Sequence, residues 1–152
     1  MSKNQKMEQL PYSGKIYFNL VDVTIKLNHI KNIKRWISNC IQAEGLILGE
    51  LSINFCSDST LLNINIEHLN HNYYTDIITF ELGEKPVVVG DIYISIDRVK
   101  ENAIANKVTF NTELSRVMIH GVLHLCGYKD KTKIQKTEMR NKEDYYLYLL
   151  QK

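Results

Sequence analysis

Four stretches of the chain have the pattern typical of β-strands, because β-branched and aromatic residues dominate them or alternate with polar ones. The alternation is clearest in the second stretch, where Leu51, Ile53 and Phe55 fall on one face. Gly90 and Asp91 interrupt the fourth stretch, which predicts a bulge or a close approach of another segment. The third and fourth stretches are separated by a short turn, so we expect them to pair antiparallel. The predicted strands cover residues 16–25, as one strand or a strand with a bend, and residues 46–56, 77–82 and 87–96.

Five other stretches are predicted to be helices, and the first and last of them carry apolar residues at helical spacing. The last of them carries an apolar stripe that includes Met139 and Tyr146, with Glu143 among the charged residues that we expect on its solvent side. Ser, Thr, Asn and Asp favour helix starts, since their side chains accept a hydrogen bond from the first turn. The predicted first residues or caps are Asn28, Asp58 or Ser59, Asp97, Asn111 or Thr112, and Thr132. The predicted helices end near residues 43, 69, 106, 126 and 149.

The order of these elements, β-α-β-α-β-β-α-α-α, predicts an α+β fold. We expect a single domain over residues 14–152, with a mixed sheet of about four strands and helices packed on it. A chain of 152 residues can bury one sizeable core. Residues 1–13 are mostly polar, and we expect them to form a flexible tail.

The bulk composition is that of an ordinary globular protein, with 44% hydrophobic and 24% charged residues. A net charge of +2 permits binding to a polyanion without arguing strongly for it. The cysteines Cys40, Cys56 and Cys126 are widely spaced and no signal peptide is evident, which predicts reduced thiols in a cytoplasmic protein. No apolar run reaches the length that spans a membrane, so we expect no membrane partner.

The candidate chemistry lies in the predicted helix 112–126 and the residues that follow it. His120 and His124 are four residues apart, so both imidazoles lie on one face of a helix and can bind one metal ion. Gly127 can end the helix and turn the chain, which would bring Asp130 back toward the two imidazoles. Three protein ligands with a fourth position left for water are typical of a catalytic zinc site. We therefore predict that His120, His124 and Asp130 bind the metal and that Cys126 belongs to the core.

Two other interpretations of this segment stay open at this point. Two histidines on a buried helix face can be structural residues with satisfied hydrogen bonds. The spacing HxxxHxxGxxD also matches the layout of metzincin peptidases, which have a glutamate directly after the first histidine as general base. Gly121 occupies that position here. A phosphodiester is a better candidate substrate than a peptide, because metal-assisted attack on it does not require that base.

Three motifs, in order, make the chain resemble the YbeY family of bacterial ribosomal RNA maturation factors. The family signature HGxLHLxGYDH stands here as HGVLHLCGYKD at residues 120–130. The family segment TDVLSF stands as TDIITF at 75–80, and GDIxIS as GDIYIS at 90–95. The resemblance covers about residues 16–145. It implies a metal-dependent, single-strand-specific endoribonuclease, with one Zn²⁺ per chain, in ribosomal RNA maturation and ribosome quality control.

The resemblance also implies single-stranded RNA, ribosomal RNA precursors and the small ribosomal subunit as partners, with no role for DNA. The chain departs from the family at three positions. Asp130 stands for the usual histidine ligand, and Lys129 for an aspartate. A carboxylate ligand makes the metal a weaker Lewis acid and broadens the choice of metal toward harder cations. Leu69 stands where the family has an arginine thought to bind RNA phosphate; His68 or His71 nearby is a candidate to replace it.

Other polar and aromatic residues around the motifs have open roles. Tyr73 and Tyr74 are either stacking platforms for RNA bases or ordinary core or loop residues. Asp76 and Asp91 either support the site or bond to backbone. Two rival functions also stay open. One is a metal-stabilised RNA-binding or ribosome-assembly factor with little intrinsic catalysis, and the other is a metallopeptidase-like hydrolase.

Overall fold

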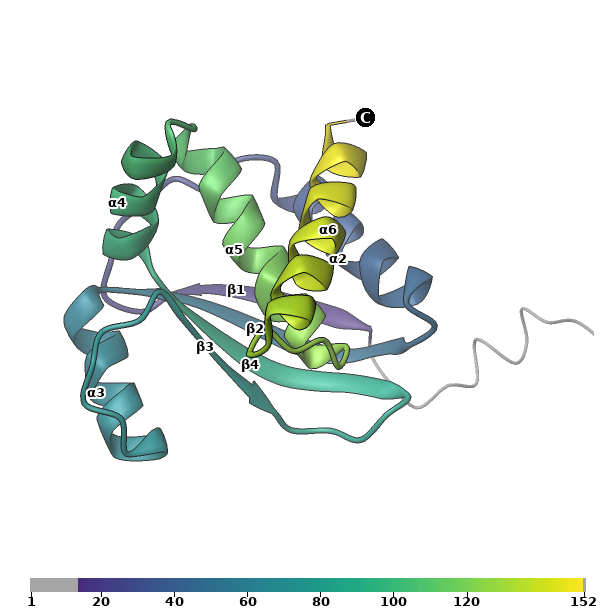
Figure 1. Cartoon of the computed structure of the whole chain (residues 1–152), viewed down its shortest axis with the longest axis horizontal. Coiled ribbons are helices and arrows are strands. Elements are labelled where there is room, and N and C mark those ends of the chain that lie inside the picture. Colours follow the sequence, from purple (N-terminus) through teal and green to yellow (C-terminus); the bar gives the residue numbers. More distant parts are fainter. Residues whose placement is uncertain (1–13, 152) are drawn as a thin grey trace, which may run out of the picture.

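The computed structural model describes residues 14–151, so the expected tail at 1–13 lies outside the described residues. A four-stranded mixed sheet lies at its centre in the order β1-β2-β4-β3 (Figure 1). β1 (Lys15–Leu20), β2 (Ile47–Cys56) and β4 (Val87–Ser95) are parallel, and β3 (Ile77–Glu81) is antiparallel to β4. The α+β fold, the mixed sheet and the antiparallel third and fourth strands are therefore confirmed.

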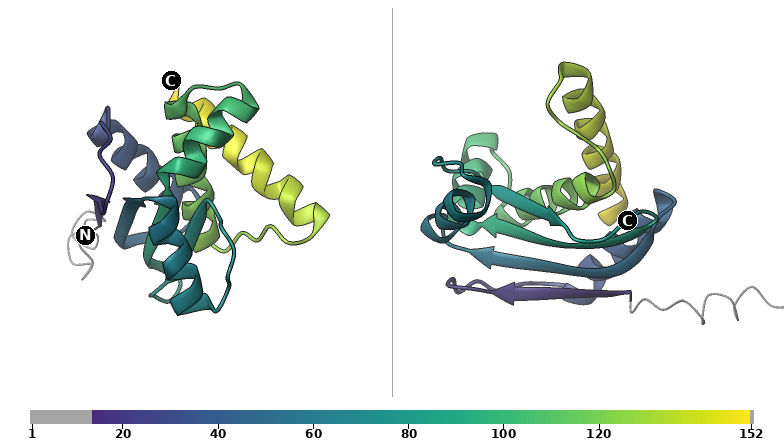
Figure 2. Two further views of the ribbon diagram at one scale, coloured as in Figure 1. Left: turned by 90° about the vertical axis from the view of Figure 1, so that its left-hand side faces the viewer. Right: turned by 90° about the horizontal axis from the view of Figure 1, so that it is seen from below.

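Five helices complete the described part of the fold. They are α2 (Ile30–Ala43), α3 (Asp58–Leu69), α4 (Ile96–Asn106), α5 (Phe110–Leu125) and α6 (Lys133–Leu150). α2, α5 and α6 lie on one side of the sheet, and α3 lies at one end of it (Figure 1). The two views in Figure 2 show the curved sheet with β1 at its outer edge. No helix in residues 14–151 is long and apolar enough to cross a membrane.

The main core lies between the sheet and the helices on that side. Leu51, Ile53 and Phe55 of β2 are fully buried, as predicted for one face, but Asn54 and Cys56 on the other face are buried as well. From α5, Ile119 and Leu123 are equally buried and pack into the same cluster. Buried side chains run along α5 from Glu113 to Leu125, which makes the helix a rigid support for the side chains on its other face.

α5 approaches the sheet closely at two glycines. A Cβ on Gly121 would lie 2.8 Å from Ile77 Cδ1 and 3.1 Å from Ile92 Cδ1. A Cβ on Gly90 would lie 2.7 Å from the Phe80 carbonyl oxygen and 3.0 Å from Leu125 Cδ1. The interruption at Gly90 is therefore a close approach, and the irregular register lies in β2 between Leu48 and Glu50 instead. Glycine at both positions lets the end of α5 lie directly on the sheet.

The first strand is shorter than its β-branched sequence predicts. β1 ends at Leu20, and residues 21–29 form a loop. The reason is Asp22, whose carboxylate accepts hydrogen bonds from the Ser57 backbone at 2.8 Å and from the Ser57 and Thr60 hydroxyls at 2.6 and 2.7 Å. These contacts draw the chain out of the sheet toward the start of α3.

Several helix starts differ from the predictions by one or two residues. The caps of α3, α4 and α5 are hydroxyl residues, Ser57, Ser95 and Thr109, each of which accepts a hydrogen bond from the backbone three residues on. An acid lies in the first turn of each of these three helices, Asp58, Asp97 and Glu113 respectively, where it interacts favourably with the helix dipole. Asn28 is not the cap of α2; His29 precedes that helix in a left-handed conformation and makes no capping bond. Thr132, predicted as the first residue of the last helix, is the cap of α6, which begins one residue later at Lys133.

Candidate metal centre

α5 and the turn after it bring His120, His124 and Asp130 together, as predicted from their spacing. The two imidazole Nε2 atoms lie 3.0 Å apart. Asp130 Oδ2 lies 3.2 Å from Nε2 of His120 and 3.3 Å from Nε2 of His124. The turn uses Gly127, whose φ of 110° is one that other residues rarely adopt. Among residues 14–151 these three form the one group of histidine, cysteine or acidic side chains arranged to hold a metal ion.

The outer nitrogens of both imidazoles are held by oxygen atoms. His120 donates from Nδ1 to Glu143 Oε2 at 2.6 Å, and His124 donates from Nδ1 to the Tyr128 carbonyl at 2.9 Å. Carboxylate and carbonyl oxygens only accept, so each Nδ1 carries a proton. In the neutral imidazole each Nε2 then has a lone pair, and Asp130 Oδ2 lies close to both nitrogens. Such outer bonds fix the tautomer and the orientation of metal-binding histidines.

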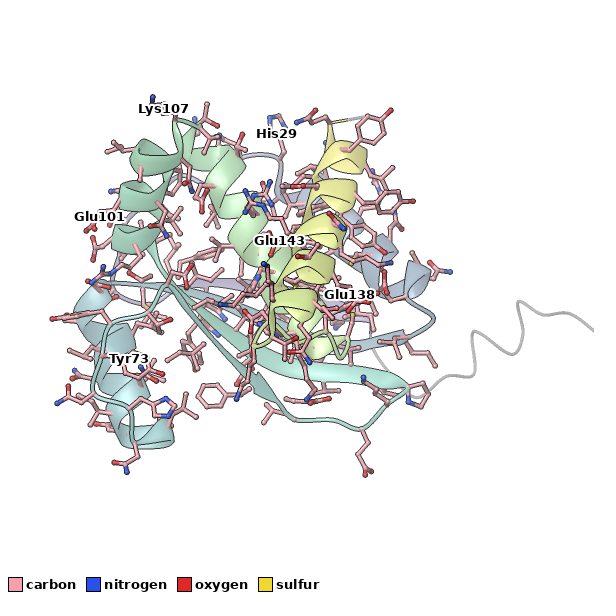
Figure 3. The ribbon with its side chains drawn as sticks, in the orientation of Figure 1. His29, Tyr73, Glu101, Lys107, Glu138 and Glu143 are labelled. Atoms are coloured by element: carbon pink, nitrogen blue, oxygen red, sulfur yellow. The ribbon has the colours of Figure 1, made fainter. Side chains whose placement is uncertain are left out.

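Glu143 is the residue of this site that the sequence interpretation missed. We expected it on the charged surface of the last helix, but it is only 5% exposed. The expectation was wrong because Glu143 lies four residues after Met139 and three before Tyr146, on the buried stripe of α6. An acid on an apolar stripe needs a partner, and that signal was available in the sequence. Figure 3 shows Glu143 on the side of α6 that faces α5.

Arg116 also holds the Glu143 carboxylate in place. Arg116 donates to Glu143 Oε1 at 2.8 Å and to Asp144 Oδ1 at 2.7 Å. Burial alone would raise the pKa of Glu143, but the hydrogen bonds from His120 and Arg116 outweigh it and lower that pKa. Burial likewise opposes protonation of His120, and the bond to Glu143 with the nearby acids raises its pKa. The Glu143 carboxylate therefore stays ionised and favours positive charge at His120.

The donor set fits a metal ion. Two imidazole nitrogens and one carboxylate oxygen converge within 4.8 Å, an arrangement that a proton or a metal ion among them stabilises. In a tetrahedral centre with bonds of 2.0–2.1 Å, ligand atoms lie roughly 3.3 Å apart. The observed separations of 3.0, 3.2 and 3.3 Å are close to that value. His120, His124 and Asp130 could thus hold an ion without large movements.

The other residues singled out in the sequence lie around this centre or away from it. Cys126 is 9% exposed, belongs to the core cluster and takes no part in the ligand group; burial raises the pKa of its thiol to about 12. All three cysteines are free and buried. Asp76 lines a pocket with His120 and Asp130, while its carbonyl accepts from the Ser95 backbone at 2.9 Å. Asp91 lies in β4 opposite Phe80 and is not part of the group.

The loop after α3 places aromatic side chains on the surface. Tyr73 and Tyr74 are 56% and 51% exposed, so they are not core residues. His71 stacks on Tyr73 and bonds to its hydroxyl at 3.0 Å, and His68 packs edge-on against Phe80. The exposed Leu69 side chain offers no charge at the position of the expected arginine.

Gly121 bears on the peptidase interpretation. Its Cα faces the sheet at Ile77 and Ile92, about one quarter turn around α5 from the two histidines. The position is used for packing, and a larger acid there would meet the core. The general base that the metzincin layout requires is therefore absent from the residue after His120.

Comparison with known proteins gives one consistent family. A family model described as endoribonuclease YbeY matches residues 17–151. Proteins named endoribonuclease YbeY include one from Karelsulcia muelleri, 49% identical over 78% of this chain and 84% of its own length. Another, from Flavobacterium psychrophilum, is 46% identical over 88% of this chain and 95% of its own. A Thermotoga maritima protein solved in solution is 27% identical, with a TM-score of 0.66 over 90% of this chain and 89% of that one.

Proposed function

Since this chain belongs to the YbeY family of endoribonucleases, we propose that it cleaves single-stranded RNA in a metal-dependent reaction and acts in ribosomal RNA maturation. The observation that carries the proposal is the convergence of two Nε2 lone pairs and one carboxylate oxygen at 3.0 to 3.3 Å. The rest of the proposed setting follows the family: ribosomal RNA precursors on the small ribosomal subunit, in the cytoplasm, with no action on DNA.

His120, His124 and Asp130 are the proposed ligands, and we propose Zn²⁺ as the ion. Two imidazoles and a carboxylate, with one position left free, are a donor set that suits catalytic zinc. When bound, the ion supplies Lewis-acid activation of water and neutralises charge on the attacked phosphate. The protein orients the donors: Glu143 holds the His120 ring, and the Tyr128 carbonyl holds the His124 ring. Neither Glu143 nor Tyr128 needs to touch RNA to have a large effect on metal binding.

The exposed aromatic loop supports a single-stranded substrate. Unpaired bases can stack on tyrosine rings, whereas paired bases are already stacked in a helix. Tyr73 and Tyr74 offer two such rings, and the Arg98 guanidinium lies 5.0 Å from the centre of the Tyr74 ring. We propose that this loop contributes to RNA binding.

A second candidate function is an RNA-binding ribosome-assembly factor with little intrinsic catalysis. The specific observation in its favour is the exposed, uncharged Leu69 where the family's phosphate-binding arginine is expected. The metallopeptidase interpretation is weaker, because Gly121 is used to pack α5 on the sheet. The two remaining functions differ in one measurable property, the hydrolysis of RNA.

Metal content and RNA cleavage measured on the same preparations test the proposal. The proteins are the wild type, His120→Ala, Asp130→Ala and a control, His29→Asn. His29 lines a different pocket together with Asn111 and Thr112, at the start of α5. Asparagine tolerates the left-handed conformation of that residue. The substrates are one labelled RNA, single-stranded or annealed to its complement, and the matching DNA strand.

We expect the wild type and the control to carry about one zinc per chain and to cut only the single-stranded RNA. Both site variants should lose the metal and the cleavage together. Wild-type protein that holds metal and leaves RNA intact would support the assembly-factor function instead. If His120→Ala still cleaved RNA, the metal centre would have no part in the reaction.

A further inference from the structure

Two pockets flank the proposed metal centre. The first has a volume of about 280 Å³, contains His120 and is lined by Lys136 and Arg140 of α6; we call it the α6 pocket. The second has a volume of about 620 Å³ and contains His124; its cations are Lys85, Lys129 and Lys131, and we call it the lysine pocket. Asp130 lines both pockets. The centre therefore lies between them, with cations on either side.

Most of these cations have no structural role in the described part of the chain. The side chains of Lys129, Lys131 and Lys136 are exposed and make no hydrogen bond or ion pair within residues 14–151. Arg140 is 61% exposed and has one long contact, 3.8 Å to Glu143. Arg116 differs, because both its terminal nitrogens are bonded to acids at 2.7 and 2.8 Å. The four exposed cations are free to bind an anion.

Within the described residues, the acids of the two pockets make one ion pair with the four exposed cations, the 3.8 Å contact between Glu143 and Arg140. In the α6 pocket, Glu143 is paired with Arg116, and the buried Glu113 accepts from Asn106 at 3.4 Å. Asp76 and the ligand Asp130 are the remaining acids there, beside Lys136 and Arg140. In the lysine pocket, three lysines face Glu81 and the ligand Asp130. Each pocket thus presents exposed cations beside the centre, Lys136 and Arg140 in the first and Lys129 and Lys131 in the second.

We propose that one RNA strand crosses the metal centre from the α6 pocket to the lysine pocket. Lys136 and Arg140 bind the phosphate on one side of the cleaved bond, and Lys129 and Lys131 bind the phosphate on its other side. The inference rests on the proposed function and adds the path of the substrate. A chain of evenly spaced phosphates suits cations placed on both sides of the reacting one, whereas a mononucleotide would use only one side. The path also explains an internal cut, because the strand must extend beyond the centre in both directions.

Two double variants test the path: Lys136→Gln with Arg140→Gln, and Lys129→Gln with Lys131→Gln. The matched control removes two exposed lysines elsewhere, Lys31→Gln on α2 with Lys100→Gln on α4. We measure metal content, RNA affinity by fluorescence anisotropy, and kcat and KM for a single-stranded RNA at several salt concentrations. Each pocket variant should weaken binding and raise KM roughly tenfold at low salt, with metal content unchanged.

The salt dependence gives a second readout. The slope of log affinity against log salt should become shallower by about 0.7 for each phosphate of the single strand that a variant no longer binds. The control should keep the wild-type slope. An RNA with one uncharged methylphosphonate linkage, placed on either side of the cleaved bond, then assigns the pockets. Each pocket variant should be insensitive to the uncharged linkage on one side only and retain full sensitivity on the other.

The outcomes separate this inference from the proposed function. If the wild type cleaves RNA while both pocket variants keep its affinity and salt slope, the path is wrong and the endoribonuclease function stands. If the variants lose metal, their cations support the centre and do not bind RNA, which also overturns the path. If the wild type holds metal without cutting RNA, the proposed function fails, and the anisotropy series still decides whether the strand lies across both pockets.

Discussion

At the scale of single residues, the centre depends on which nitrogen of each imidazole carries its proton. The Glu143 carboxylate and the Tyr128 carbonyl each accept from an Nδ1 atom, which leaves both Nε2 atoms free to bind metal. Arg116 then holds Glu143 from the other side at 2.8 Å. The chain Arg116, Glu143, His120 joins α5 to α6 through charged groups that are largely shielded from water.

Replacing Glu143 by glutamine should weaken metal binding without removing a ligand. The amide keeps the shape of the side chain but loses the charge that favours the bound cation and fixes the His120 tautomer. We expect zinc affinity to fall by about 10- to 100-fold, measured by competition with a chelating dye. Asp144→Asn is the matched control, since Asp144 is the other acid on Arg116 but is 56% exposed and contacts neither histidine. Equal losses in the two variants would contradict a positioning role for Glu143.

Asp130 should determine which metals the centre prefers. A carboxylate oxygen suits harder cations, whereas an imidazole nitrogen favours zinc over manganese. Asp130→His is therefore expected to increase the ratio of zinc affinity to manganese affinity by about tenfold or more, measured by competitive titration of the two ions. Asp130→Ala serves as the control, because it should weaken both ions together. An unchanged ratio in Asp130→His would mean that Asp130 does not bind the ion.

At the scale of elements, the position of the centre is set by how closely α5 lies on the sheet. Gly90→Ala should show this, because its Cβ would lie 2.7 Å from the Phe80 carbonyl and 3.0 Å from Leu125 Cδ1. Replacing glycine by alanine at an uncrowded strand position would stabilise the fold by about 0.5 kcal/mol or more. A loss of stability in Gly90→Ala must therefore come from the clash. We expect the free energy of unfolding in urea to fall by about 1–3 kcal/mol. Asn63→Ala on the exposed side of α3 is the control; a neutral Gly90→Ala would contradict the close approach.

The sequence predicts the elements well and their ends less well, for a physical reason. Apolar spacing is repeated many times in a helix or strand, so β2 and α5 were recognisable from several residues each. An end depends on one side chain, and Ser57 and Asp58 compete as caps with similar chemistry. β1 ended early because Asp22 bonds to Ser57, a contact 35 residues away that no local pattern reveals.

The residues of the candidate site also differ in how well the sequence predicts them. His120, His124 and Asp130 follow each other on one helix and one turn, so their spacing was enough to bring them together. Glu143 belongs to another helix and reaches the site only through the packing of α6 on α5. The exposed cations of the two pockets come from three places: the β3–β4 connection, the turn that follows α5, and helix α6. Only the folded chain places them around one centre.

At the scale of the whole molecule, Glu44 links three segments behind the centre. It follows α2, and its carboxylate accepts from the Tyr128 hydroxyl at 2.7 Å, from Lys142 at 3.1 Å and from the Tyr146 hydroxyl. Tyr128 is also the residue whose carbonyl holds His124. The Glu44 side chain is 10% exposed, so these partners replace most of its water. The Glu44 carboxylate therefore supports both the stability of the fold and the geometry of the site.

The stability that Glu44 contributes should depend on pH. Burial by itself raises the pKa of this carboxyl, but the hydrogen bonds from Tyr146, Tyr128 and Lys142 outweigh it and lower the pKa below its ordinary value of 4.5. A group with a lowered pKa in the folded state stabilises the fold fully above its unfolded pKa, and this stabilisation is lost as pH falls through the folded value. Glu44→Gln should thus be less stable than the wild type at neutral pH, and the difference should shrink below about pH 4.

Urea unfolding of both proteins from pH 7 to about pH 3 measures this difference. Glu138→Gln is the matched control, because Glu138 lines a pocket with Glu44 but is exposed and makes no side-chain hydrogen bond or ion pair within the described chain (Figure 3). Its stability should follow the wild type at every pH. If the stability difference between Glu44→Gln and the wild type stayed constant over the whole pH range, the Glu44 side chain would stabilise the fold through its shape and not through its charge. A difference that shrinks with falling pH, together with weaker metal binding at neutral pH, would show that the network behind Tyr128 supports both the fold and the centre.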